Sequence, residues 1–434
     1  MIRKRIQLAL IHMAVAMALV PINSTLNRVM IKELAISATL VAILAALPYL
    51  FSPLQVVIGS YSDLHPFFGY RRTPYIAAGL LLCVAGVMVA PHVVYLMPTN
   101  GLLGLLLSVL AFGAWGMGFN LASVAYLSLA SEISGEKGRS RTVSIMWFVM
   151  IIGIIVTAAV LSRLVTGYSP QRIQQAFEII GFAALAVGGL GLIGLEDRVR
   201  QDVPPPPLRQ RVGWQVLVAN VLSVPAARHF FFYLIILLAA ILGQDVLLEP
   251  YAGHAFHLPV EATTRITSFW GGCVLLALLA AGWLELRVGK RAVARVGAVG
   301  GITGFLLIAV SGWLGWVNLF YAGVILLGLG TGLATVSNLS LMLDMTTAQV
   351  GLYIGAWGMA DALARLLGTV LSGAVRDVVA FLSGSDLWGY GIVFIIQAGL
   401  LVVSIIMLSR VNVDRFRSQS LSTAERAALL QEAS

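Results

Sequence analysis

Charged residues are scarce in this chain of 434 residues. Lys, Arg, Asp and Glu together make up 11% of the sequence, whereas soluble domains carry roughly 25%. The chain is 59% hydrophobic, and its mean hydropathy is +0.92. This composition excludes an ordinary soluble domain and indicates an all-α protein that crosses a membrane many times.

Cysteine is rare too, and the motifs of several enzyme classes are absent. Cys83 and Cys273 lie in apolar stretches far apart in the sequence, which excludes a disulfide framework and a CxxC site. The sequence has no Asp-rich prenyl-diphosphate motif, no nucleotide-binding loop and no dinucleotide fingerprint. We therefore expect no enzymatic activity and no free metal ion. The pI of about 9.8 is expected to reflect basic loops beside a lipid bilayer, with no nucleic-acid partner.

A polar run from Glu196 to Gly213 lies near the middle of the chain. It contains four consecutive prolines, which favour an extended spacer, between flanking arginines. Six long apolar segments precede this run and six follow it. We predict an N-terminal six-helix half, a cytoplasmic linker, a C-terminal six-helix half and a cytoplasmic tail, over residues 1–195, 196–213, 214–409 and 410–434.

Each apolar segment reaches the ~20 residues that a helix needs to cross a bilayer. The N-terminus, the even-to-odd loops, the linker and the tail hold 21 of the 28 Lys and Arg residues. This bias predicts that both termini are cytoplasmic. The expected spans are 8–28, 37–60, 74–97, 101–130, 142–165, 176–195, 228–250, 264–285, 293–312, 317–341, 351–379 and 389–409.

The loop after the second expected span contains a glycine, an aspartate and a basic cluster. The pattern resembles the signature loop of the major facilitator superfamily, in which such residues form a cytoplasmic gate, although this loop is longer. An ordinary basic turn is the alternative. The resemblance implies the major facilitator fold, with an aspartate that can pair with arginine. The matching positions are Gly59, Asp63, Gly69, Arg71 and Arg72.

The fourth and tenth expected helices resemble each other. Glycines 113, 116 and 118 precede Asn120 in one, and glycines 328, 330 and 332 precede Asn338 in the other. Equivalent places in the two halves suggest a weak internal repeat. We expect the glycines to serve close helix packing first of all.

The most specific stretch covers residues 243–256, at the end of the seventh expected helix. Asp245 and Glu249 are four residues apart, so a continuous helix would place them on one face, after Gln244. Carboxylates inside a membrane are costly and usually face a cavity or a partner. Pro250 is expected to break the helix, and Tyr251 to lie at the membrane interface.

The pattern Gln-Asp-x-Leu-Leu-Glu-Pro-Tyr in this stretch resembles the PucC/LhaA family, a branch of the major facilitator fold in photosynthetic bacteria. Three further stretches agree with that family and extend the resemblance over both halves. They are LNRVMI, RRTPYI and GAWGMA, at residues 26–31, 71–76 and 355–360.

The resemblance implies an assembly factor that binds or delivers bacteriochlorophyll, or a precursor, to light-harvesting antenna polypeptides in the bacterial cytoplasmic (photosynthetic) membrane. Two alternatives stay open. One is a secondary transporter or flippase for an amphiphile. The other is a membrane anchor subunit for bacteriochlorophyll synthase or geranylgeranyl reductase.

Several polar side chains are candidates for such a site. A histidine can ligate the magnesium of a chlorin, although each histidine here is more simply explained as an interfacial or packed residue. The candidate pigment-binding residues are His229, His12, Gln244, Asp245, Glu249 and Tyr251. Further intramembrane polar candidates are Asn27, Arg28, Asn120 and the i,i+4 pair Asp361 and Arg365. The end of the tail, from Ser422, is expected to be either a short amphipathic helix or disordered.

Overall fold

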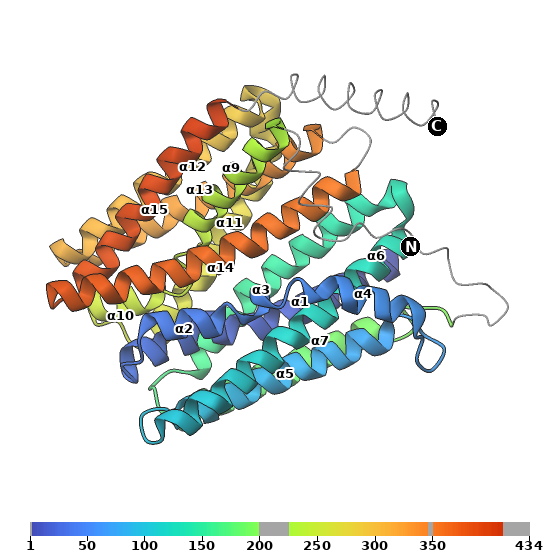
Figure 1. The fold of residues 1–434 in the computed structure, drawn as a ribbon, viewed down its shortest axis with the longest axis horizontal. Helices are drawn as coiled ribbons and strands as arrows, with labels where there is room; N and C mark the ends of the chain where they lie inside the picture. Colours follow the sequence, from blue (N-terminus) through green and yellow to red (C-terminus); the bar gives the residue numbers. More distant parts are fainter. Residues whose placement is uncertain (1, 199–224, 346–349, 411–434) are drawn as a thin grey trace.

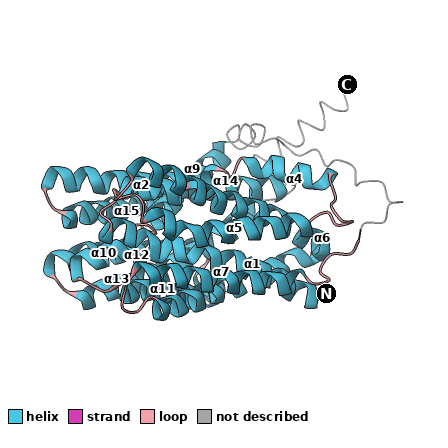
Figure 2. Cartoon of the chain, turned by 90° about the horizontal axis from the view of Figure 1, so that it is seen from below, coloured by secondary structure: helices cyan, strands magenta, loops and turns pink. Residues whose placement is uncertain are grey.

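The computed structural model describes residues 2–198, 225–345 and 350–410. Within these ranges the chain is almost wholly helical, and its helices run roughly along one direction in two bundles (Figure 1 and Figure 2). Most of the linker predicted at 196–213 and the tail after Arg410 lie outside the described residues.

The first bundle contains nine helical segments. Side-chain caps explain two of their starts, because the Ser37 and Ser169 hydroxyls accept from the amides of Leu40 and Arg172. The segments are α1 (Ile2–Pro21), η1 (Ile22–Leu26), η2 (Val29–Glu33), α2 (Ala38–Ala45), α3 (Leu47–Leu50), α4 (Leu54–Leu64), α5 (Thr73–Val94), α6 (Gly101–Leu164) and α7 (Pro170–Leu192).

The second bundle follows the linker. Its helices are α9 (Pro225–Leu242), α10 (Leu248–Phe256), α11 (Val260–Val288), α12 (Lys290–Leu314), α13 (Val317–Met345), α14 (Val350–Ser383) and α15 (Asp386–Ser409). We call the end of the molecule with Arg198 and Pro225 the linker end, and the opposite end, with α10 and the turn between α14 and α15, the far end (Figure 1).

Ten helical spans among the described residues are long and apolar enough to cross a membrane. They correspond to ten of the twelve expected spans, and α6 supplies two of them because Gly135, at φ 62°, kinks the helix between the fourth and fifth. The second and seventh spans are each present but interrupted. The second consists of α2, α3 and α4, and the seventh of α9 and α10.

The expectation of a continuous helix over 37–60 was therefore wrong. Pro48 and Pro53 cannot donate to a helix ladder, and the segments begin anew around them. Asn120 of α6 supports the first interruption, because its amide nitrogen donates to the Pro48 carbonyl at 2.7 Å and Gln55 donates to its oxygen. A Cβ at Gly116 would lie 2.9 Å from the Pro48 nitrogen, so this glycine admits the bent segment.

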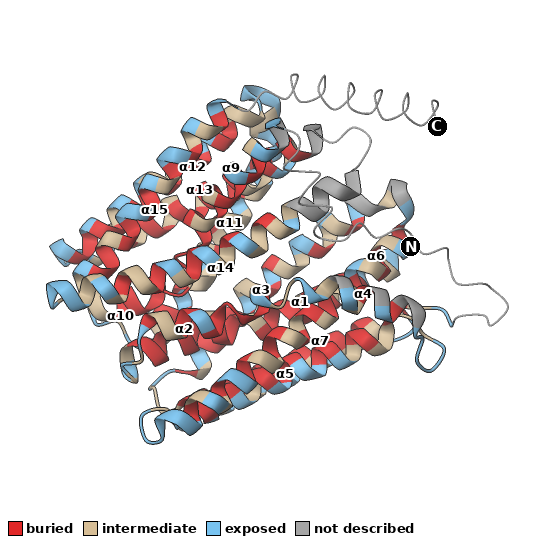
Figure 3. Ribbon diagram, in the orientation of Figure 1, coloured by how far each residue is buried: buried red, intermediate tan, exposed pale blue. Residues whose placement is uncertain are grey.

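Close helix packing explains most of the glycines of the fourth and tenth helices, as the sequence suggested, whereas a Cβ at Gly113 would meet nothing within 4 Å. Cβ atoms at Gly118 and Gly330 would lie 2.2 Å from the Cys83 nitrogen and 2.5 Å from the Gly297 carbonyl. Buried residues fill the inside of each bundle, and exposed apolar residues cover much of its outside (Figure 3). This is the burial pattern of a protein solvated by lipid.

Candidate functional site

The seventh helix is interrupted by residues 243–247, between α9 and α10. Within this segment the hydrogen bonds are partly turn-like, such as that from the Asp245 amide to the Leu242 carbonyl at 3.1 Å. Pro250 is the third residue of α10, where its missing N–H costs nothing. The prediction that Pro250 breaks the helix was wrong: the break precedes the proline.

This break separates the two acids that the sequence placed on one helical face. Asp245 lies in the irregular segment and Glu249 in α10, so the i,i+4 rule does not apply to them. Asp245 lies 3.7 Å from Arg365, whereas Glu249, only 3% exposed, accepts from the Thr267 hydroxyl at 2.6 Å. The two carboxylates thus belong to different polar clusters.

The first cluster contains three charged side chains. The Arg365 Nε donates to Asp361 at 3.0 Å, as the spacing on α14 predicts, and its guanidinium also faces Asp245. The Tyr49 ring, from α3 of the other half, lies 5.5 Å from the Arg365 guanidinium carbon. We call Asp245, Asp361, Arg365 and Tyr49 the central cluster.

The Gln244 side chain extends this cluster. Its Nε2 donates to Asp245 at 2.8 Å, while its buried Oε1 has no partner among the described residues. Two glycines allow the approach of α9 and α14. A Cβ at Gly243 would lie 2.8 Å from the Gly368 carbonyl, and one at Gly368 would lie 2.6 Å from the Ala239 carbonyl.

The second cluster surrounds Arg28, which is 1% exposed. Its guanidinium donates to Glu33 at 2.6 Å and to the Leu258 carbonyl of the other half at 2.9 Å. A Cβ at Gly253 would lie 3.3 Å from this guanidinium, so the glycine lets it lie against α10. Asn27 has a local role, since its side chain donates to the Asn23 carbonyl.

Further contacts join the two halves near the far end. The Thr25 and Thr264 hydroxyls lie 2.9 Å apart, and the Ser162 hydroxyl donates to the Glu261 carbonyl. Asp377 accepts from the Thr39 amide at 2.8 Å and also from the Ala38 amide, at the start of α2. Asp377 thus connects α14 with a helix more than three hundred residues earlier in the chain.

Tyr251 was predicted at the membrane interface but is 1% exposed in the aromatic core of the second half. Its hydroxyl donates to the Ile308 carbonyl at 2.5 Å, and its ring lies 5.1 Å from that of Phe394. The interface prediction was wrong because α10 continues past Pro250 and turns Tyr251 inward. Tyr251 therefore has a packing role here.

Two glutamates that are not among the predicted gate-like positions bind the loop between α4 and α5. Glu196 accepts from the amides of Arg71, Arg72 and Thr73 at the start of α5, and Glu132 accepts from the Arg72 guanidinium at 2.8 Å. Gly69 adopts φ +80°, and the Gly59 carbonyl accepts from Ser62. The side chain of Asp63 lies outside the described residues.

The candidate histidines differ in their surroundings. The His229 Nε2 lies 3.0 Å from the Met407 carbonyl and so has a partner. His12 is 8% exposed, and its Nδ1 has no partner among the described residues. Its ring lies 5.2 Å from that of Tyr126 and 6.1 Å from that of Trp147.

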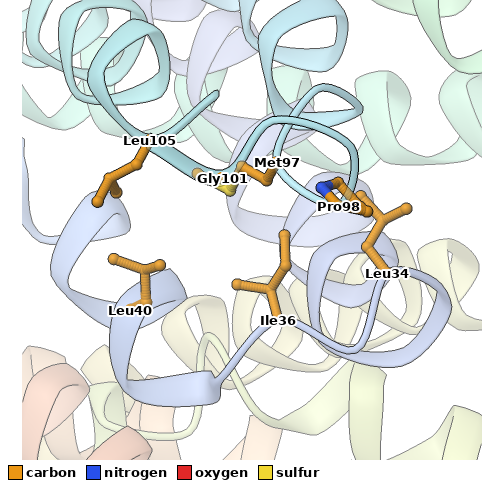
Figure 4. Close-up of a pocket in the computed structure, with 7 residues that line it drawn as sticks. All are labelled: Leu34, Ile36, Leu40, Met97, Pro98, Gly101 and Leu105. Carbon is orange, nitrogen blue, oxygen red and sulfur yellow. The ribbon is translucent and has the colours of Figure 1, made fainter. Parts of the chain in front are cut away.

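An apolar pocket of about 230 Å³ opens near the far end, between the start of α2 and the turn before α6 (Figure 4). None of its lining residues belongs to the polar clusters. Within the part of the chain that the structure describes, no group of three or more His, Cys, Asp or Glu could hold a metal ion. The pocket is lined by Leu34, Ile36, Leu40, Met97, Pro98, Gly101 and Leu105.

Residues 25–416 match the family model described as "PUCC protein". The chain belongs to the PUCC family. It is 32% identical to the protein PucC of Rhodobacter capsulatus over 430 residues, which cover 92% of this chain and 90% of that protein. Another PUCC-type relative, 29% identical over 94% of this chain and 95% of its own length, is the "Bacteriochlorophyll synthase 44.5 kDa chain" of Rhodobacter capsulatus.

The fold of this PUCC protein is that of major facilitator transporters. A mutant of the nucleoside transporter NupG superposes with a TM-score of 0.74 at 14% identity, over 94% of this chain and 99% of that one. A bacterial homologue of the lysosomal transporter Spinster gives 0.72 at 11% identity, over 95% and 96%. The expected multi-pass membrane protein with a major facilitator fold is confirmed.

Proposed function

We propose that this protein is a non-enzymatic assembly factor that binds or delivers bacteriochlorophyll, or a precursor, for light-harvesting complexes. Family membership over residues 25–416 is the observation that carries the proposal. The name of the synthase-chain relative gives a link to the same pigment. The expected partners are antenna polypeptides, with bacteriochlorophyll synthase or geranylgeranyl reductase as further candidates.

The surroundings of His12 fit a chlorin. A bound bacteriochlorophyll would supply a magnesium ion, for which a neutral imidazole nitrogen is a suitable ligand. The buried Nδ1 of His12 has no partner among the described residues, and the rings of Tyr126 and Trp147 offer flat apolar surfaces beside it. The side chain of His229 fits less well, because its Nε2 faces a carbonyl.

The test is an absorption spectrum with mass spectrometry of the protein gently purified from photosynthetic membranes. A red-shifted chlorin band with stoichiometric pigment and co-purifying antenna or biosynthetic proteins would support the proposal. A colourless, solitary protein from pigment-replete cells would contradict it.

The role of His12 is tested by His12→Ala in the same preparation. This variant should lose most of the co-purifying pigment, because the axial ligand is removed. His92→Ala is the matched control: His92 is exposed on α5, and its Nδ1 faces the carbonyl of Met88. Equal pigment content in both variants would exclude His12 as the ligand.

A transporter or flippase for an amphiphile is the second candidate. Two interrupted helices meet at the central cluster, on the boundary between the halves, and such breaks mark substrate sites in transporters. Substrate-dependent flux in proteoliposomes would favour this candidate over the assembly factor.

The orientation of the chain is a separate expectation. Reporter fusions at both termini would test the expected cytoplasmic location of both chain ends in the photosynthetic membrane.

A further inference from the structure

The charges of the central cluster do not balance. It contains the carboxylates of Asp245 and Asp361 and only one cation, Arg365, so its formal charge is −1. Asp361 receives a hydrogen bond from Arg365 at 3.0 Å, whereas Asp245 lies 3.7 Å away and receives none from it. The negative charge on Asp245 is therefore the less compensated one.

This imbalance lies well inside the membrane-spanning part. Arg365 is near the middle of α14, and Asp245, 3.7 Å from it, lies at the break between α9 and α10. The exposed fractions of Asp245, Arg365 and Asp361 are 34%, 28% and 26%, so all three carry open surface. Unbalanced charge at this depth is costly, and a bound counterion would remove that cost.

A second, independent observation points to the same ligand. Gln244 is 2% exposed, its amide group contacts the cluster through the Nε2 atom, and its Oε1 has no hydrogen-bond partner among the described residues. A buried amide oxygen that lacks a donor is itself costly. Gln244, Asp245 and Asp361 carry amide and carboxylate oxygens, which are hard donors, and two of these residues belong to an irregular stretch of backbone.

We propose that the break in the seventh helix is a binding site for one monovalent cation, a proton or Na⁺, held by Asp245 with Asp361 and Gln244. One added positive charge neutralises the cluster. A divalent ion would leave it at +1, and the cluster has no third carboxylate among the described residues to balance that charge. Irregular helix segments in transporters coordinate monovalent ions in this way.

The site also connects the two halves. The Arg365 guanidinium faces both aspartates on one side and the Tyr49 ring of α3 on the other. A cation at Asp245 competes with Arg365 for that carboxylate, so occupancy changes how firmly Arg365 is held against Tyr49. Among the described residues, the charged and titratable groups around Asp245 are Arg365 and Asp361 on α14 and Tyr49 on α3; Glu249, across the break in the helix, belongs to the other cluster.

The experiment measures the Tm of the purified full chain in lipid nanodiscs, in NaCl and in choline chloride of equal ionic strength, over a range of pH. If Na⁺ is the ligand, NaCl should raise the wild-type Tm by about 3 °C or more. If the proton is the ligand, Na⁺ has no effect, and the wild-type Tm rises as the pH is lowered through the neutral range. Either dependence should vanish in Asp245→Asn.

Asp197→Asn is the matched control, since its carboxylate is 90% exposed at the linker end. Gln244→Met keeps every charge but removes the amide oxygen, and should weaken the Na⁺ dependence several-fold even if Asp245→Asn fails to fold. A wild-type Tm that depends on neither Na⁺ nor pH, or a dependence that Asp245→Asn retains in full, would overturn the proposal.

Discussion

At the scale of single residues, the stretch 243–256 divides into side chains with different tasks. Asp245 is partly open and ion-paired, Glu249 is buried under a threonine hydroxyl, and Tyr251 is packed in an aromatic core. One sequence motif thus contributes to a polar cluster, a contact between α10 and α11, and a hydrophobic core. Similarity along the motif does not by itself make every residue a ligand.

Replacing Tyr251 with Phe should therefore leave antenna assembly intact. The variant loses one buried hydrogen bond, to the Ile308 carbonyl, and should lose about 1 kcal/mol of stability. Thermal unfolding and antenna absorption spectra check the two parts. An assembly defect in a stably inserted Tyr251→Phe protein would show that the hydroxyl has a functional role.

At the scale of elements, the two interrupted helices are held by close backbone contacts. Gly116 and Asn120 of α6 support the break in the second helix, and Gly243 and Gly368 bring α9 against α14 at the break in the seventh. For the second helix, the sequence contains a direct indication of the break, because Pro48 and Pro53 lie within the expected span. For the seventh, the sequence predicted a break at Pro250, but Pro250 lies in the first turn of α10, where proline is tolerated.

Replacing Gly368 with Ala should separate α14 from α9. The new Cβ would lie 2.6 Å from the Ala239 carbonyl, and this overlap should cost about 1–3 kcal/mol. The measurement is the Tm in detergent. Gly358→Ala is the control on the same helix, since its Cβ would meet nothing within 4 Å. Equal stability of the two variants would contradict the close approach.

At the scale of the whole molecule, contacts between the halves gather near the far end. They include the pair Thr25 and Thr264, the Arg28 contact with the Leu258 carbonyl, and the cap of α2 by Asp377. Ion pairs at the linker end, such as Arg72 with Glu132, lie within one half. The described structure therefore holds its halves together at the end opposite the linker.

Cysteines at positions 25 and 264 should form a disulfide on oxidation, because the native hydroxyls lie 2.9 Å apart. The native Cys83 and Cys273 are first replaced. The double variant Thr25→Cys with Thr264→Cys is then compared by mass spectrometry with each single cysteine variant. An assembly factor that works without opening at the far end should remain active when cross-linked. Loss of antenna assembly, restored by reduction, would favour the transporter-like candidate.

Composition and hydrophobic segments alone determined that this is a polytopic helical membrane protein, because apolar segments of this length are stable as membrane-spanning helices and not in water. The resemblance of four short stretches also predicted the PUCC family correctly. Sequence spacing placed Asp361 beside Arg365, since both lie on one unbroken helix. It could not place Asp245 there, or separate Asp245 from Glu249, because the helix between them is interrupted. Only the tertiary structure decided those partners, through glycine contacts between helices more than a hundred residues apart in the chain.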